Sequence, residues 1–135
     1  MKPISAALAI CVAAILCTTA AHAIDRCGSS KRITCVVDGD TLWLRGEKFR
    51  LQGFDTPETT TNLCGGAREK RLGNQATARL IQLLNNAEVT FRRKGKDRYG
   101  RTLADFYVDG VEVGGMLIAE GLARSWPDGR EFWCE

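Results

Sequence analysis

Histidine is almost missing from this sequence, and closely spaced cysteine pairs are missing altogether. The single histidine, His22, lies in an apolar amino-terminal segment that we expect to be removed. Without histidine the remaining chain cannot build a Ser-His-Asp or Cys-His nucleophilic site, and without a CxxC pair its cysteines fit a zinc site poorly. Excess charge is small too, with 19 Lys and Arg against 16 Asp and Glu, so the distribution of charge indicates more than its sum.

Long apolar runs occur only at the amino terminus. Lys2 supplies a positive start, residues 4–20 are almost all apolar or small, and Ala21-His22-Ala23 resembles a small-x-small cleavage site. This pattern predicts a secretory signal peptide over residues 1–23. A transmembrane anchor is the alternative, although the apolar stretch is short for a span. We therefore expect a secreted or periplasmic protein with no membrane association after cleavage.

Four cysteines remain in the expected mature domain, residues 24–135, which is long enough for one small core. An even number of cysteines in an exported domain favours two disulfides over a zinc site. Three pairings are possible for Cys27, Cys35, Cys64 and Cys134. We favour Cys27–Cys35, which would staple the start of the first strand, and Cys64–Cys134, which would tie the chain end to a long loop.

Hydrophobic periodicity predicts a mainly β domain with some helix, of the α+β class. Alternating apolar residues or turn signals indicate five strands, and helical spacing indicates two helices. The predicted strands cover residues 33–37, 41–45, 48–54, 88–91 and 102–108, and the helices residues 67–84 and 111–120. The first three strands read as an antiparallel meander. Five short strands with a helix between the third and fourth suggest a small OB-fold Greek-key barrel.

Residues 37–58 gather acidic side chains at the ends of neighbouring predicted strands. Asp40 and Asp55 would lie side by side, and the carbonyl of Thr56 would add a third oxygen ligand. Calcium accepts carboxylates, carbonyls and water in flexible geometry. The alternative is that D-G-D and D-T-P-E are ordinary turns, since these residues favour turns anyway.

Arginines supply the charge that a phosphate would need. Arg50 lies in an otherwise hydrophobic strand, five residues before Asp55, so a regular strand would put the two on opposite faces. A bulge at Gly53 is therefore required to bring them together. Residues 92–101 form a basic tract in which Tyr99 offers a ring to a base or sugar, and Arg101 begins the fifth strand. Glu58 is the carboxylate left to orient or deprotonate a water molecule. Together, the acidic residues and the arginines predict a metal-assisted phosphodiesterase.

Three motifs in this order, together with a fourth segment, resemble the staphylococcal nuclease, or thermonuclease, family. They are V-D-G-D-T at residues 37–41, F-R-L-Q-G-F-D-T-P-E at 49–58 and D-R-Y-G-R at 97–101, and G-M-L-I-A-E-G-L-A-R follows at 115–124. The resemblance implies an OB-fold nuclease that binds one calcium ion and cuts DNA and RNA to leave 3′-phosphate ends. It also implies nucleic acid as the partner, and we expect a monomer.

The same resemblance assigns roles to single residues. It implies calcium ligation by Asp40, Asp55 and the Thr56 carbonyl, phosphate binding by Arg50 and Arg101, water activation by Glu58, and nucleotide phosphate contacts from Arg98 and Tyr99. The chain departs from the family pattern in a shorter hairpin between Asp40 and Arg50 and in the absence of a final helix. Ser125-Trp126-Pro127 also does not match the family's nucleotide-packing tyrosines.

Two other classes of function remain as alternatives. One is a non-catalytic OB-fold module that holds nucleic acid or an oligosaccharide, and the other is a disulfide-stapled extracellular module that binds structural calcium. Glu58 together with Arg50 and Arg101 favours the enzyme, because binding alone would not need a carboxylate beside the phosphate.

Overall fold

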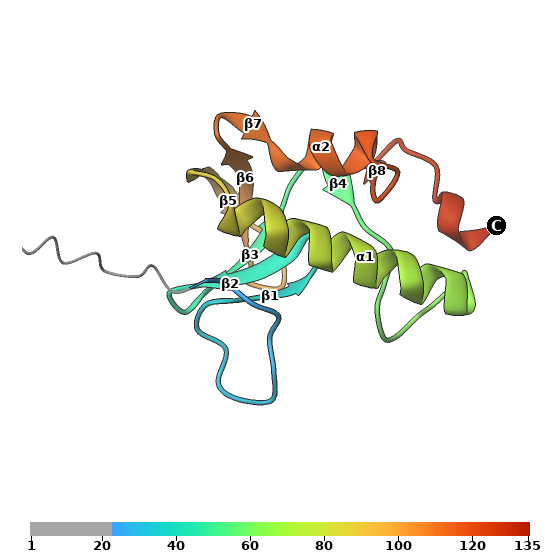
Figure 1. The fold of residues 1–135 in the computed structure, drawn as a ribbon, viewed down its shortest axis with the longest axis horizontal. Helices are drawn as coiled ribbons and strands as arrows, with labels where there is room; N and C mark the ends of the chain where they lie inside the picture. Colours follow the sequence, from blue (N-terminus) through green and yellow to red (C-terminus); the bar gives the residue numbers. More distant parts are fainter. Residues whose placement is uncertain (1–22) are drawn as a thin grey trace, which may run out of the picture.

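The fold was obtained as a computed structural model that describes residues 23–135 (Figure 1). The predicted signal peptide, residues 1–23, lies outside the described residues except for Ala23. Within the described part, a mixed β-sheet is covered by two α-helices, so the predicted α+β class is confirmed. No helix in this part of the chain is long and apolar enough to cross a membrane.

The first three strands form the predicted antiparallel meander. They are β1 (Cys35–Asp38), β2 (Thr41–Leu44) and β3 (Glu47–Leu51). Arg45 and Gly46 join β2 to β3 with φ angles of 51° and 82°, as a two-residue hairpin turn with two positive φ angles requires. The sheet order is β1-β2-β3-β6-β5, and the contact between β3 and β6 is parallel.

The second half of the sheet contains a strand that is longer than predicted. β5 (Val89–Lys96) continues to Lys96 beside β6 (Thr102–Val108), whereas the expected strand ended at residue 91. Its basic residues remain in the ladder because acidic partners lie next to them. Lys94 Nζ is 2.6 Å from Asp105 Oδ2, and Arg93 Nη2 is 2.7 Å from Glu47 Oε2. These ion pairs let a strongly charged segment extend the sheet.

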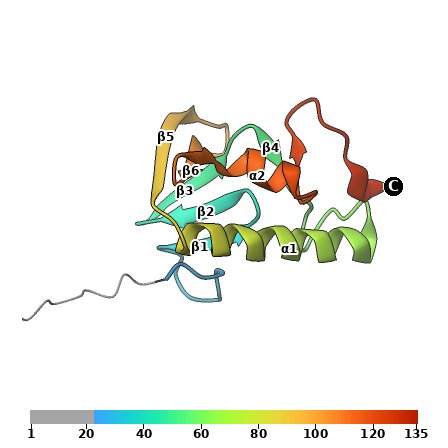
Figure 2. The ribbon, with the colours of Figure 1, turned by 45° about the horizontal axis from the view of Figure 1, so that its top comes forward.

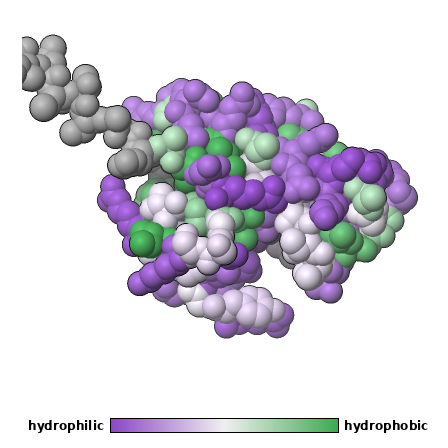
Figure 3. Space-filling model, turned by 60° about the horizontal axis from the view of Figure 1, so that its bottom comes forward, coloured by the Kyte–Doolittle hydropathy of each residue, from purple (hydrophilic) through white to green (hydrophobic). Residues whose placement is uncertain are grey.

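Helices α1 (Gly66–Asn85) and α2 (Val113–Ala119) cover the sheet and lie side by side in two views (Figures 1 and 2). α1 confirms the predicted helix, whereas α2 begins two residues later than expected because β7 (Val111–Glu112) pairs with β6. The core between helices and sheet contains Val36, Leu42, Phe49, Leu51, Phe54, Leu80, Phe106, Val113 and Leu117. On the face in Figure 3, apolar atoms form separated patches within a mainly hydrophilic surface.

The carboxyl-terminal part returns to the acidic stretch. β8 (Arg124–Ser125) pairs with β4 (Phe54–Asp55) in a second, two-stranded sheet, and a short 3₁₀ helix, η1 (Phe132–Cys134), ends the chain near the start of α1. Disulfides join Cys27 to Cys35 and Cys64 to Cys134, which confirms the favoured pairing. The second disulfide fixes the chain end beside the loop that leads into α1.

Candidate active site

Three strand ends bring Asp40, Arg50 and Asp55 together. Asp40 comes directly before β2, Arg50 pairs across the meander with Thr41, and Asp55 ends β4. The Nη2 atom of Arg50 is 3.4 Å from Asp40 Oδ2 and 3.6 Å from Asp55 Oδ1. The guanidinium therefore lies between two carboxylates, which is the clustering that the sequence predicts.

The route that brings Arg50 to Asp55 differs from the expected bulge. β3 ends at Leu51, the chain bends through Gln52 and Gly53, and β4 belongs to the second sheet. Gly53 has a φ of 85°, which a residue with a Cβ rarely adopts. Arg50 donates hydrogen bonds to the carbonyls of Leu51 at 2.6 Å and Phe54 at 3.2 Å. The bend thus wraps around the arginine side chain. The alternation of side chains along a regular strand therefore does not hold between Arg50 and Asp55.

Asp40 is buried and held by hydrogen bonds to both oxygens. Thr41 Oγ1 donates to Oδ1 at 3.0 Å, and Thr56 donates to Oδ2 from its backbone nitrogen at 3.0 Å and its hydroxyl at 3.2 Å. A Cβ on Gly39 would lie 2.7 Å from Thr56 Cγ2, so the glycine of D-G-D allows this close approach. These contacts use the amide and hydroxyl of Thr56, and ligation by its carbonyl stays a prediction.

The Glu58 side chain is partly exposed, but it lies between buried residues on a loop that a buried carboxylate anchors. The backbone nitrogen of Glu58 donates to Glu69 Oε1 at 3.2 Å, and that of Gly65 donates to Glu69 Oε2 at 2.8 Å. Glu69 is only 1% exposed. Helix α1 also approaches the loop closely, because a Cβ on Gly73 would lie 2.6 Å from the Pro57 carbonyl oxygen. The loop that carries Glu58 is therefore fixed to the helix at both ends.

Four carboxylates, those of Asp38, Asp40, Asp55 and Glu58, share this region with two arginines, Arg50 and Arg124. Burial raises the pKa of Asp38 to about 7, with Asp40 adding to the effect. Burial also raises the pKa of Asp55, against hydrogen bonding from Arg124, and the pKa of Glu58, with Asp40 and Asp55 adding to it. A carboxylate with a raised pKa is a better proton acceptor. The surplus charge and the all-oxygen donors suit a hard divalent cation such as calcium.

Arg50 and Arg101 line one pocket of about 400 Å³ together with Arg98, Tyr99 and Trp126. The parallel pairing of β3 with β6 brings the start of β6 next to Arg50. Arg101 Nε lies 2.7 Å from Asp97 Oδ2, and the guanidinium carbons of Arg98 and Arg101 lie 4.8 and 5.6 Å from the Tyr99 ring centroid. Both predicted phosphate arginines and both predicted nucleotide contacts thus share a pocket.

Three residues of the site were absent from the sequence prediction. Arg124 donates from Nε to Asp55 Oδ2 at 2.9 Å, Glu69 anchors the Glu58 loop, and Trp126, which is 53% exposed, lines the pocket. An acidic residue among basic ones in A-R-E-K-R was a signal for Glu69. Arg124 closes the motif G-L-A-R, but its partner depends on the β4–β8 pairing, which the sequence does not reveal.

Another group of possible ligand atoms lies at the chain end. The side chains of Cys64, Glu131 and Cys134 are within 4.8 Å of one another. Both sulfurs belong to the Cys64–Cys134 disulfide, so neither can act as a thiolate ligand. This cluster therefore ties the chain end together and does not add a metal site.

Residues 48–131 match the family described as Staphylococcal nuclease homologue. A thermonuclease of Staphylococcus intermedius is 35% identical over 104 residues, which is 73% of this chain and 60% of that protein. An uncharacterized endonuclease of Haemophilus influenzae is 29% identical over 117 residues, covering 83% and 61%. Endonuclease YncB of Bacillus subtilis is 40% identical over 96 residues, covering 65% and 44%. The chain thus spans about three fifths or less of each relative's length.

Proposed function

Because the chain belongs to the Staphylococcal nuclease homologue family, we propose that it is a calcium-dependent nuclease that hydrolyses phosphodiester bonds of DNA and RNA. The observation that carries this proposal is the placement of Arg50, which lies within 3.6 Å of Asp40 and Asp55 and lines the same pocket as Arg101. Arg50 would then lie between the carboxylates proposed to hold calcium and the pocket proposed to hold the phosphate. The relatives named as endonucleases support the same reaction.

Each side chain has a separate role in the proposed reaction. Asp40, Asp55 and the Thr56 carbonyl would hold calcium, which, when bound, stabilises negative charge on the phosphoryl oxygens. Arg50 and Arg101 bind these oxygens and stabilise the extra charge that develops on them. Because the donors are already held by hydrogen bonds and ion pairs, little rearrangement is needed when the charge appears.

Glu58 acts as the general base in this reaction. Its carboxylate accepts a proton while the water oxygen bonds to phosphorus, and the bond from phosphorus to the 5′ oxygen breaks. The departing oxygen takes a proton from solvent, so the products are a 3′-phosphate and a 5′-hydroxyl. The raised pKa of Glu58 favours this proton transfer.

Two exposed aromatic side chains suit the pocket to a nucleic acid strand. Tyr99 is 68% exposed and Trp126 is 53% exposed, and both line the pocket with the arginines. Bases stack on aromatic rings with little dependence on sequence. Trp126 would thus supply a stacking surface where the family pattern has tyrosines, which is consistent with a substrate of either DNA or RNA.

The place of action follows from the disulfides and the amino-terminal sequence. Two disulfides in a small domain fit an oxidising compartment. We therefore propose export by the signal peptide at residues 1–23 to a periplasmic or extracellular location, where the protein acts as a monomer.

Incubation of the purified, oxidised protein with DNA and RNA, in calcium or in EGTA, tests the proposed function. We expect cleavage in calcium only, with products that lose terminal phosphate to a 3′-phosphatase. An Arg50→Ala variant should lose most activity, whereas Arg79→Ala, which removes an ion pair between α1 and Glu120 at the end of α2, should not. Binding of nucleic acid without cleavage would instead support the non-catalytic module, and calcium binding without nucleic acid binding would support the structural calcium module.

A further inference from the structure

Asp55 has one carboxylate oxygen occupied by an arginine that is not among the expected site residues. Arg124 Nε donates to Asp55 Oδ2 at 2.9 Å, whereas Oδ1 faces Arg50 Nη2 at 3.6 Å. The pairing of β4 with β8 sets Asp55 directly opposite Arg124. The two oxygens therefore have different surroundings, because Oδ2 is fixed by a hydrogen bond and Oδ1 faces Arg50.

Resting on the proposed function, we propose that Arg124 is a positioning residue for the metal centre. It fixes the rotation of the Asp55 carboxylate, so that Oδ1 would be left free to hold calcium. Partners that hold a ligand in orientation commonly affect metal affinity by about 10- to 100-fold. Arg124 is not among the residues that line the pocket of Arg50 and Arg101, so its proposed effect on the metal centre runs through Asp55.

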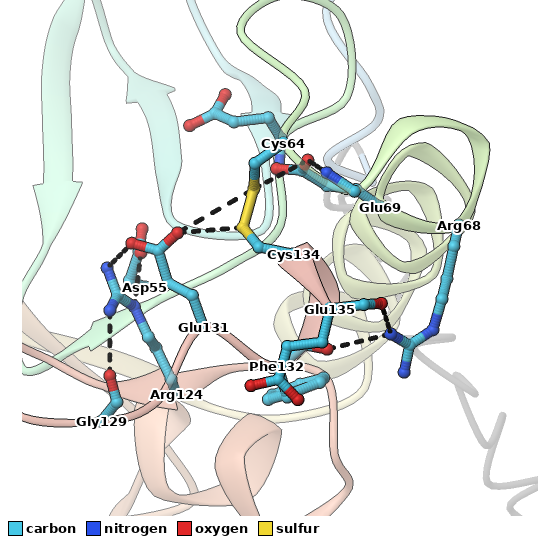
Figure 4. The surroundings of a disulfide bond; sticks show 12 residues. Asp55, Cys64, Arg68, Glu69, Arg124, Gly129, Glu131, Phe132, Cys134 and Glu135 are labelled. Atoms are coloured by element: carbon cyan, nitrogen blue, oxygen red, sulfur yellow. Dashed lines mark hydrogen bonds and ion pairs between the residues drawn. A yellow bond between two sulfur atoms is a disulfide. The ribbon is translucent and has the colours of Figure 1, made fainter.

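Arg124 is itself held at every nitrogen of its guanidinium (Figure 4). Besides Asp55, it donates from Nη1 to the Gly129 carbonyl at 2.9 Å, and its Nη2 lies 2.6 Å from Glu131 Oε1. Its guanidinium carbon lies 5.0 Å from the Trp126 ring centroid and 5.7 Å from that of Trp133. The side chain is only 10% exposed. Such a fork of donors cannot be reproduced by lysine, which has a single ammonium group.

The partners of Arg124 belong to a segment that the Cys64–Cys134 disulfide fastens. Residues 124–135, which we call the carboxyl-terminal segment, run from β8 through the turn at Gly129 to η1. Glu131 links Arg124 to the disulfide, because its Oε1 contacts Arg124 Nη2 and its backbone carbonyl accepts a hydrogen bond from the Cys134 nitrogen at 3.0 Å. The disulfide thus holds Glu131 where it can orient Arg124, and Arg124 orients Asp55.

Calcium binding by the full oxidised protein tests this proposal by titration calorimetry. Arg124→Gln and Arg124→Lys are expected to raise the Kd for calcium by about 10- to 100-fold. The matched control Arg79→Gln removes an arginine–carboxylate pair away from the site and should leave the Kd unchanged.

A Glu131→Gln variant keeps the proposal testable even where Arg124 variants fold poorly. It removes the ion pair that orients Arg124 without changing Asp55, so its calcium Kd should lie between those of the wild type and Arg124→Gln. A purely structural role would lower the melting temperature and leave the Kd of the folded protein unaltered, which would overturn the proposal. If the wild type cleaves nucleic acid in calcium and Arg124→Gln binds calcium as tightly as the wild type does, this inference alone is overturned. Wild-type protein that binds no calcium overturns the proposed function as well.

Discussion

The two disulfides close loops of very different length, and the difference predicts which one matters more for stability. Cys64 and Cys134 are 70 residues apart, whereas Cys27 and Cys35 are 8 apart. We compare two double variants, Cys64→Ser/Cys134→Ser and Cys27→Ser/Cys35→Ser. Each removes one disulfide and adds two hydroxyls, so each serves as the control for the other.

The loop lengths give the expected free energies of unfolding. With the chain-entropy relation, the link over 70 residues stabilises the fold by about 4.4 kcal/mol at 25 °C and the link over 8 residues by about 2.5 kcal/mol. The short loop is also held by backbone hydrogen bonds, from the Cys27 nitrogen to the Val36 carbonyl and from the Val36 nitrogen to the Asp25 carbonyl. Loss of its disulfide therefore leaves local structure that reduces the cost further.

Urea unfolding followed by tryptophan fluorescence measures both values, because Trp133 is buried beside Cys134. We expect the free energy of unfolding to fall by about 2 kcal/mol more in the Cys64/Cys134 variant than in the Cys27/Cys35 variant. Calcium affinity should also weaken only in the former, since only that disulfide fastens the carboxyl-terminal segment. Equal losses of stability, or a larger loss in the Cys27/Cys35 variant, would refute the reasoning.

Three other substitutions test separate parts of the structure. Hydrogen bonds from Arg93 and Thr102 lower the pKa of Glu47 to about 2 from its ordinary 4.5, so its ionised form stabilises the fold above pH 4.5 and this stabilisation is lost as the pH falls toward 2. The melting temperature of Glu47→Gln should therefore fall less over that range than that of the wild type, and parallel curves would contradict this. Trp126→Leu should raise the KM for nucleic acid by about 5- to 150-fold, the equivalent of 1–3 kcal/mol of stacking, and an unchanged KM would exclude base stacking there. Glu69→Gln should lower kcat and leave calcium affinity intact, because one of its two acceptor oxygens remains and the Glu58 loop is held less firmly; an unchanged kcat would show that the anchor is dispensable.

Local patterns were sufficient to predict the sheet where one face is buried. β6 alternates buried and half-buried residues along its whole length, and the β1–β2–β3 meander follows from short strands and a tight turn. The disulfide pairing was predictable because one bond fastens the start of the first strand and the other fastens the carboxyl-terminal end to a long loop. These features depend on residues near one another in sequence or on the position of the termini.

Features that depend on pairing between distant segments could not be predicted. The extension of β5 requires Glu47 and Asp105 to lie beside Arg93 and Lys94, and an isolated basic run reads as a turn. The bend at Gly53 was expected as a bulge, because the sequence does not show that β4 leaves the main sheet to pair with β8. For the same reason Arg124 had no visible partner, although the site residues near it were anticipated from their motifs.

Cleavage of a defined phosphodiester by Glu58→Gln in saturating calcium is the most direct test of the proposed active site. Glutamine cannot accept the proton of the attacking water, so the single-turnover rate should fall by about 10²- to 10⁴-fold. Calcium affinity and nucleic acid binding should remain at wild-type values, because Asp40, Asp55, Arg50 and Arg101 are unchanged. A wild-type cleavage rate in this variant would contradict the assignment of Glu58 as the base.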